Sequence, residues 1–129
     1  MTRLLTVLLL LLATTAAASD GIYKKTTQAP ADKVYTEVYK ALENERFWVV
    51  FEANIGENIK RFADKWGEEY NRSGLTAMRS MVVCNGWWAK AVSNADPDMV
   101  ALCPLRVNIT AIDGVTSVIF SLSRVFCGS

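Results

Sequence analysis

The hydrophobic positions along the chain follow two periods, and the clearest stretch has the period of a β-strand. The run FWVVFEA, which begins at Phe47, is aromatic, β-branched and almost continuous, as in a strand that is covered on both faces. Strict alternation puts Phe47, Val49 and Phe51 on one face and Trp48 and Glu52 on the other. Helices can cover one face, so the second face is expected to need another subunit, a ligand or a lid.

Two segments on either side of this strand have the spacing of amphipathic helices. The first helix is predicted to begin at Pro30, because a proline loses no hydrogen bond at a helix start. Its apolar face contains Val34 and Val38. The second helix is predicted to follow Gly56, and its apolar stripe places Trp66 in the core. Charged side chains occupy the opposite face of both helices, which is typical of surfaces that contact solvent.

The C-terminal half predicts a strand, a short helix and a hairpin. Residues 77–84 form an apolar strand, and residues 85–94 form a helix whose N-cap is Asn85. Residues 105–122 alternate on both sides of Asp113-Gly114, which favours a type I′ turn and pairs Ile112 with Val115. The hairpin therefore has one apolar face and one largely polar face.

The order of elements predicts the fold class. Residues 21–27 are β-prone, and their lysines suit the edge of a sheet because they discourage pairing with other chains. The complete order is then β-α-β-α-β-α-β-β. This order predicts a two-layer α+β fold with a mixed or antiparallel sheet, helices on one face and a C-terminal β-hairpin.

The first residues have the three parts of a secretory signal peptide. Arg3 is followed by the apolar run 4–13 and by small residues, with an A-x-A cleavage site at 16–18. The run is much shorter than the roughly 20 residues that span a bilayer. We therefore expect a signal peptide at residues 1–18 and one domain at residues 19–129, exported to the periplasm or outside the cell without a stable membrane span. An uncleaved anchor is the alternative.

Charge and histidine content exclude several classes of function. The chain has 14 basic and 13 acidic residues, so removal of Arg3 leaves 13 of each. Without a basic excess, nucleic acid is not an expected partner. The chain has no histidine, which excludes Ser-His-Asp and Cys-His catalysis and the usual catalytic zinc sites. The composition favours a binding protein without a cofactor over an enzyme.

The three cysteines are an odd number for an exported protein. Cys84 lies where a strand ends and a helix begins, and the helix dipole at such a position can activate a thiol. The alternatives are a small core residue and a disulfide with Cys103, which would close a loop of about 20 residues. Cys127 lies near the C-terminus, where it could pair with another chain or exchange with an upstream disulfide. A weaker alternative is that the sulfur atoms of cysteine and methionine side chains bind Cu(I), for which they are soft ligands.

The tryptophans indicate an aromatic surface. Trp87 and Trp88 are adjacent on the predicted helix, about 100° apart, so both cannot face the core. One of them is expected at a pocket rim or an interface, where tryptophan is favoured. With Trp48, they form a candidate ligand-binding set that also includes Asn85 and Arg106. Arg106 lies on the polar side of the hairpin, where it could contact an anion.

Residues 79–120 resemble the family called domain of unknown function 302. The resemblance depends on the order of Cys84-Asn85, the aromatic helix, Asp96-Pro97 and the segment from Cys103 to Arg106. Here the cysteine precedes Pro104, whereas it follows the proline in the family. The resemblance implies a compact α+β domain that forms a dimer and has no assigned activity.

These observations favour an exported, homodimeric binding or accessory module. Its aromatic surface would bind a partner subunit, a small molecule or another protein. The alternative is a periplasmic thiol-redox or sulfur-handling protein, in which Cys84 reacts and Cys103 resolves. A second alternative is a Cu(I) carrier.

Overall fold

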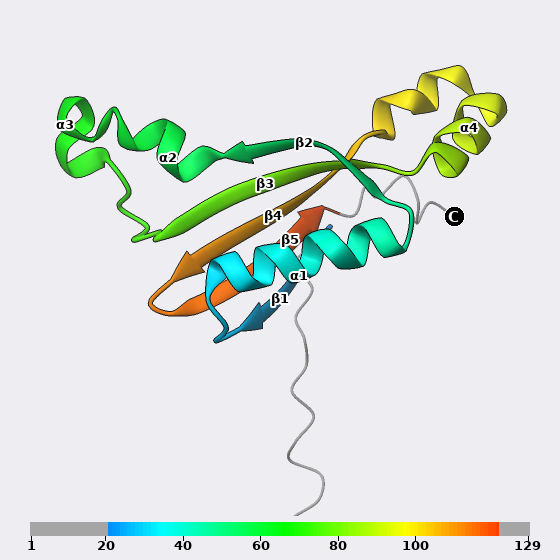
Figure 1. The fold of residues 1–129 in the computed structure, drawn as a ribbon. Helices are drawn as coiled ribbons and strands as arrows, with labels where there is room; N and C mark the ends of the chain where they lie inside the picture. The colour runs from blue at the N-terminus through cyan, green and yellow to red at the C-terminus, as the bar shows by residue number, and fades with distance from the viewer. Residues whose placement is uncertain (1–20, 122–129) are drawn as a thin grey trace, which may run out of the picture.

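A computed structural model describes residues 21–121, which form one five-stranded antiparallel sheet with helices between the strands (Figure 1). The order across the sheet is β1-β5-β4-β3-β2, so β1 and β2 are its edges. This architecture confirms the predicted α+β class and the antiparallel alternative. The predicted signal peptide and Cys127 lie outside the described residues. The strands are β1 (Ile22–Thr27), β2 (Trp48–Asn54), β3 (Ala77–Cys84), β4 (Leu105–Ile112) and β5 (Val115–Ser121).

The helices lie in three places around the sheet (Figure 1). The longest helix, α1, crosses one face, while α2 and α3 extend from one end of the strands and α4 from the other. Within the described part of the chain, no helix has the length and hydropathy needed to cross a membrane. The helices are α1 (Ala31–Asn44), α2 (Ile55–Lys60), α3 (Ala63–Trp66) and α4 (Gly86–Ala95), with 3-10 helices η1 (Gly67–Glu69) and η2 (Pro97–Leu102).

The hydrophobic core lies between α1 and the sheet. Tyr35 of α1 packs in one buried cluster with Met81, Val83, Val107 and Ile109 of the two central strands. Strand residues two positions apart point to the same face, so the alternation in β3 and β4 directs these side chains toward α1. The core therefore follows the apolar face that the sequence predicts for the hairpin.

The hairpin has the register that the sequence predicts. Ile112 pairs with Val115 across the turn. Asp113 and Gly114 have φ values of 49° and 77°, and a type I′ turn requires positive φ at both of its central residues. The two-residue turn therefore fixes which side chains of β4 and β5 meet α1.

The first edge strand, β1, confirms the prediction for residues 21–27. It pairs with β5 and is exposed along its whole length. Its lysines, Lys24 and Lys25, protect this edge from pairing with another chain.

The second edge strand, β2, differs from the prediction because it contains a β-bulge. Val49 pairs with Val83, whereas Phe51 pairs with Val82, so the strand gains one residue at Val50. One extra residue reverses the facing of every side chain after it. Phe51, predicted on the same face as Phe47 and Val49, is therefore 62% exposed.

The same bulge corrects the prediction for Glu52. Strict alternation puts this carboxylate on the face of Trp48, but Glu52 pairs with Met81, which is completely buried beneath α1. Its side chain accepts a hydrogen bond from the hydroxyl of Tyr35. The acid therefore belongs to the face that α1 covers.

The second predicted helix is also different, because the chain breaks it into short pieces. α2 ends at Lys60, and Gly67, with φ of 52°, stops α3 after four residues. A residue with positive φ cannot continue a right-handed helix. The prediction that Trp66 is in the core is therefore wrong: Trp66 is 42% exposed and stacks on Phe62, with 5.0 Å between the ring centroids.

Candidate functional site

The two described cysteines meet at one end of the sheet. Cys84 is the last residue of β3, and Cys103 follows η2 just before β4. Their Sγ atoms are 3.7 Å apart, and both side chains are half-buried free thiols. This separation is a nonbonded contact, because a disulfide bond is about 2.05 Å long. We call Cys84 and Cys103 the thiol pair.

Asn85 starts the helix that follows the thiol pair. Its Oδ1 accepts hydrogen bonds from the backbone N–H groups of Trp87 at 3.0 Å and Trp88 at 3.2 Å. An asparagine at this position satisfies donors that have no partner within the helix, which confirms the predicted N-cap. The cap fixes the direction of α4 directly beside Cys84.

Burial changes the acidity of one member of the thiol pair. The pKa of the Cys103 thiol is raised, first by burial and then by its contact with Cys84. Both effects disfavour the thiolate. At neutral pH Cys103 is therefore a protonated thiol.

An apolar cavity lies next to the thiol pair, beneath α4. Its volume is about 220 Å³, and its walls come from α4, η2, the end of β3, the start of β4 and the residue that precedes β2. The connection between β3 and β4 forms this cavity, because α4 and η2 pack together beyond the end of the sheet. The lining residues are Phe47, Val83, Asn85, Trp88, Ala89, Val92, Leu102, Cys103 and Leu105.

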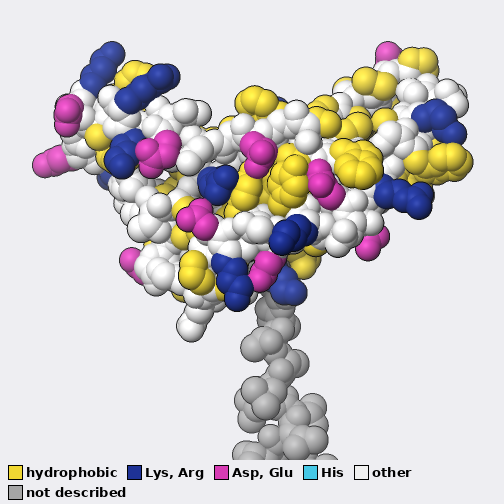
Figure 2. All heavy atoms as spheres, viewed as in Figure 1, with side chains coloured by type: hydrophobic (Ala, Val, Ile, Leu, Met, Phe, Trp, Pro, Cys, Tyr) yellow, Lys and Arg dark blue, Asp and Glu magenta, His cyan; other side chains and the backbone are white. Residues whose placement is uncertain are grey.

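The predicted tryptophans lie around this end of the molecule, and all three are exposed. The exposed fractions are 55% for Trp48, 68% for Trp87 and 60% for Trp88. Trp88 lines the cavity, whereas Lys90 lies 3.8 Å from the ring centroid of Trp87. Trp48 pairs with Cys84, so these two side chains are neighbours on one face of the sheet. Figure 2 shows hydrophobic side chains exposed over α4.

The structure brings together some of the predicted site residues and leaves others apart. Cys103, Asn85 and Trp88 line one cavity, and Cys84 contacts Cys103. Arg106 pairs with Val82 and points to the exposed face of the sheet. Among the described residues Arg106 forms no hydrogen bond or ion pair through its side chain.

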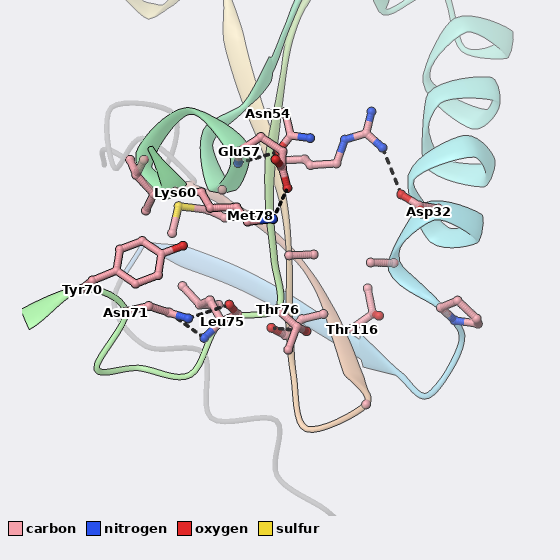
Figure 3. A pocket seen from close by; sticks show the side chains of 18 residues that line it. Asp32, Asn54, Glu57, Lys60, Tyr70, Asn71, Leu75, Thr76, Met78 and Thr116 are labelled. Atoms are coloured by element: carbon pink, nitrogen blue, oxygen red, sulfur yellow. Dashed lines mark hydrogen bonds and ion pairs between the residues drawn. The ribbon is translucent and has the colours of Figure 1, made fainter. Parts of the chain in front are cut away.

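A second and larger cleft lies at the opposite end of the sheet, between the start of α1 and α2 (Figure 3). Its volume is about 610 Å³. Arg79 of β3 lines this cleft, and its Nη1 lies 3.2 Å from Oδ1 of Asp32. The guanidinium carbon of Arg79 lies 3.4 Å from the ring centroid of Tyr35. The cluster of Arg79, Asp32, Tyr35 and Glu52 thus ties α1 to β2 and β3.

Most polar groups of this cleft already bond to one another. Asn54 accepts a hydrogen bond from the backbone of Glu57, and Asn71 both donates to and accepts from the backbone of Leu75. The hydroxyl of Thr76 donates to a carbonyl of β4. Nε of Arg79 is buried and has no hydrogen-bond partner, but it is not accessible to a ligand. We therefore assign the cleft a structural role.

The sequence reasoning missed Arg79, although the pattern contained a signal for it. Arg79, Met81 and Val83 are two residues apart, so they share the face of β3 that α1 covers. A charged residue in that series needs a partner, because burial of an unpaired charge is costly. The π-face of Tyr35 and the carboxylate of Asp32 meet this need.

The Tyr35 hydroxyl should make stability depend on alkaline pH. Burial, followed by the hydrogen bond to Glu52, raises the pKa of Tyr35 from 10.0 to about 12. The stability from the neutral phenol is therefore fully present below pH 10 and is lost as the pH rises through 12. We expect the difference in unfolding free energy between wild type and Tyr35→Phe to shrink between pH 9.5 and pH 11.5, measured by urea denaturation. A difference that stays constant over this range would contradict the assignment.

Comparisons with known proteins agree on the family and the fold. A family model described as "Domain of unknown function DUF302" matches residues 23–126. A crystal structure of an uncharacterised conserved DUF302 protein from Bacillus stearothermophilus superimposes with a TM-score of 0.66. The sequence identity is 17%, and the match covers 80% of this chain and 74% of the other. At this identity the likeness shows the fold alone. No curated protein matches the chain.

Proposed function

The chain belongs to the DUF302 family, a family of unknown function, and we propose that within it this protein is a small binding module rather than an enzyme. The observation that carries this proposal is the apolar cavity of about 220 Å³ beneath α4. Apolar walls with few polar groups are typical of sites for small molecules. The cavity would accept a single aromatic ring or a short aliphatic chain.

The geometry of the cavity supports binding in two ways. Asn85 and Cys103 are its polar side chains, and they could orient a ligand that has one polar group. Trp88 lies at its rim with 60% of its surface exposed, so a ligand could bury part of the indole. Burial of apolar surface contributes about 25 cal/mol per Å² to binding.

The test of this proposal fills the cavity and asks whether a small aromatic probe still binds. We expect indole to shift the NMR signals of the Trp88 side chain and of the α4 amides in reduced, metal-free protein. Ala89 lines the cavity, so Ala89→Leu should abolish these shifts by occupying the space. Ala91 lies on the same helix and is exposed, so Ala91→Leu is the matched control and should leave them unchanged. Equal shifts in both variants, or none in the wild type, would overturn the proposal.

We also propose that the chain forms a homodimer through the edge of β2. This edge has no lysine and exposes Val50 by 60% and Phe51 by 62%, in contrast to β1. An unprotected apolar edge strand is a template for pairing with another chain. We expect wild type to sediment as a dimer at micromolar concentration and Val50→Lys as a monomer. Thr26→Lys on the β1 edge is the control and should remain dimeric. A monomeric wild type would contradict this proposal.

Export from the cytoplasm remains part of the proposal. The N-terminal pattern of residues 1–18 supports cleavage by a signal peptidase and release into the periplasm or the medium. The intact mass of the protein recovered from its host should correspond to a chain that begins near Ser19. A mass that includes residues 1–18 would count against export by cleavage.

A second candidate function is thiol-disulfide exchange by the thiol pair. The observation that favours it is the 3.7 Å contact between the two Sγ atoms, which are 19 residues apart in the sequence. In an oxidising compartment such neighbours can form a disulfide and exchange it with another thiol. Alkylation followed by mass spectrometry should find Cys84 reactive in native protein. A Cys84–Cys103 bridge that resists reduction would exclude this function.

A further inference from the structure

We propose that Cys84 and Cys103 together bind one soft monovalent metal ion of the Cu(I) type. This site is distinct from the apolar cavity, although the two share Cys103 as a neighbour. The proposal depends on three observations: the distance between the two sulfur atoms, the number of ligands near them, and the side chains that surround them.

The distance between the sulfur atoms fits two ligands of one metal ion. Metal–thiolate bonds to a borderline-soft ion such as Zn²⁺ are about 2.3 Å long. A two-coordinate Cu(I) ion prefers its two sulfur ligands on opposite sides, which at this bond length places them about 4.6 Å apart. The Sγ atoms are 3.7 Å apart, so the thiol pair must open by about 0.9 Å to hold such an ion. β3 and the start of β4 already bring the two side chains together.

The number of ligands selects the class of metal. Among residues 21–121, no group of three or more His, Cys, Asp or Glu side chains is placed to hold a metal ion. Structural zinc needs four protein ligands, and calcium needs six or more oxygen atoms. Thiolates alone are soft ligands and favour Cu(I), which accepts few ligands. Two sulfur ligands therefore fit a soft monovalent ion better than a divalent ion.

The surroundings suit the charge that the bound ion would have. The binding step is M⁺ + 2 RSH → [M(SR)₂]⁻ + 2 H⁺, in which two S–H bonds break, two metal–sulfur bonds form and no atom is oxidised or reduced. The product has one negative charge. The N-terminus of α4, a helix of ten residues, begins two residues after Cys84, and its dipole favours a negative charge there.

Apolar neighbours also shield the thiol pair from water. Trp48 is beside Cys84 across the β2–β3 pairing, and Leu102 lines the same apolar cavity as Cys103. Both cysteines are half-buried, which leaves one side open for an ion to enter and leave. This arrangement suits a carrier more than a permanent structural centre.

The experiment is an anaerobic competition for Cu(I) between the reduced protein and the coloured chelator bicinchoninate. We expect the wild type to remove one Cu(I) per chain from the chelator and to release two protons per ion. Cys84→Ser and Cys103→Ser should each lower the affinity by more than about 100-fold, because loss of a ligand should exceed the 10–100-fold effect of an outer-shell change. Cys127→Ser is the matched control and should bind within about threefold of wild type, by the same scale.

Several results would overturn the proposal. The first is that the wild type takes no Cu(I) from the chelator. The second is that the serine variants at positions 84 and 103 bind Cu(I) as tightly as wild type. The third is that binding requires Cys127 instead. Circular dichroism of each variant shows whether it is folded. Protein oxidised with diamide should not bind Cu(I), and wild type should not retain Zn²⁺ at the same concentration. The indole test uses metal-free protein, so either proposal can fail without the other.

Discussion

Replacing Ile109 by alanine is expected to lower the free energy of unfolding by about 2–5 kcal/mol, as for other buried isoleucines. Ile109 is completely buried in the middle of β4, between α1 and the sheet. The truncation removes apolar contacts and leaves a cavity that the neighbouring Val118 and Met81 cannot fill without moving. Urea denaturation followed by circular dichroism measures the change.

The matched control for this experiment is on the same strand. Ile112 lies three residues further along β4, next to the turn, and is 40% exposed. Ile112→Ala should therefore cost less than about 1 kcal/mol, since less apolar surface is lost from the interior. If the two variants lost equal stability, α1 would not cover the face of the sheet that contains Ile109. That result would contradict the fold at its centre.

Oxidation of the thiol pair is expected to raise the free energy of unfolding by about 3 kcal/mol. The Cys84–Cys103 bridge would close a loop of about 20 residues, and the chain-entropy model gives this value for such a loop. The bridge constrains the unfolded chain, and the 3.7 Å contact means that the folded chain changes little when it forms. Denaturation of diamide-treated and reduced protein, both in a Cys127→Ser background, measures the difference.

The control for oxidation removes one member of the thiol pair. The double variant Cys84→Ser, Cys127→Ser should unfold at the same urea concentration with and without diamide. Peptide mapping should find the Cys84–Cys103 bridge in the oxidised protein. Equal stability of the oxidised and reduced forms would show that the bridge strains the folded chain as much as it constrains the unfolded one. A bridge of that kind would be easily reduced, which would favour thiol-disulfide exchange over a structural disulfide.

Oxidation and metal binding compete for the same two sulfur atoms. A bridged pair has no thiolate to offer an ion, and a bound ion protects both sulfur atoms from oxidation. The raised pKa of Cys103 affects both reactions, because each needs a deprotonated sulfur.

Local patterns were sufficient to predict most elements of the fold. The hairpin is the clearest case, because the Asp113-Gly114 turn and the alternation beside it determine the register within one segment. Asn85 is another, since an N-cap acts on backbone groups only two or three residues away. Both predictions are confirmed because short-range interactions decide these features.

Two errors have a common physical reason. The bulge at Val50 reverses the faces of Phe51 and Glu52, and it forms in the pairing with β3, about thirty residues away in the chain. Trp66 has the spacing of a core residue, but the helix pieces around it extend beyond the end of the sheet. In both cases a distant element decides the environment, and periodicity does not contain that information.

The sequence by itself determined the α+β class and the order of the elements, because turns, caps and hydrophobic periods act over a few residues. It also contained the residues with candidate chemistry and, in the order of its motifs, the resemblance that indicated the family. Only the tertiary structure decided that Cys84 and Cys103 touch, that a cavity opens beside them and that Arg79 lies against Tyr35. Each of these depends on the packing of segments that are far apart in the chain. The absence of histidine limited the chemistry, but the approach of two sulfur atoms across 19 residues defined the site.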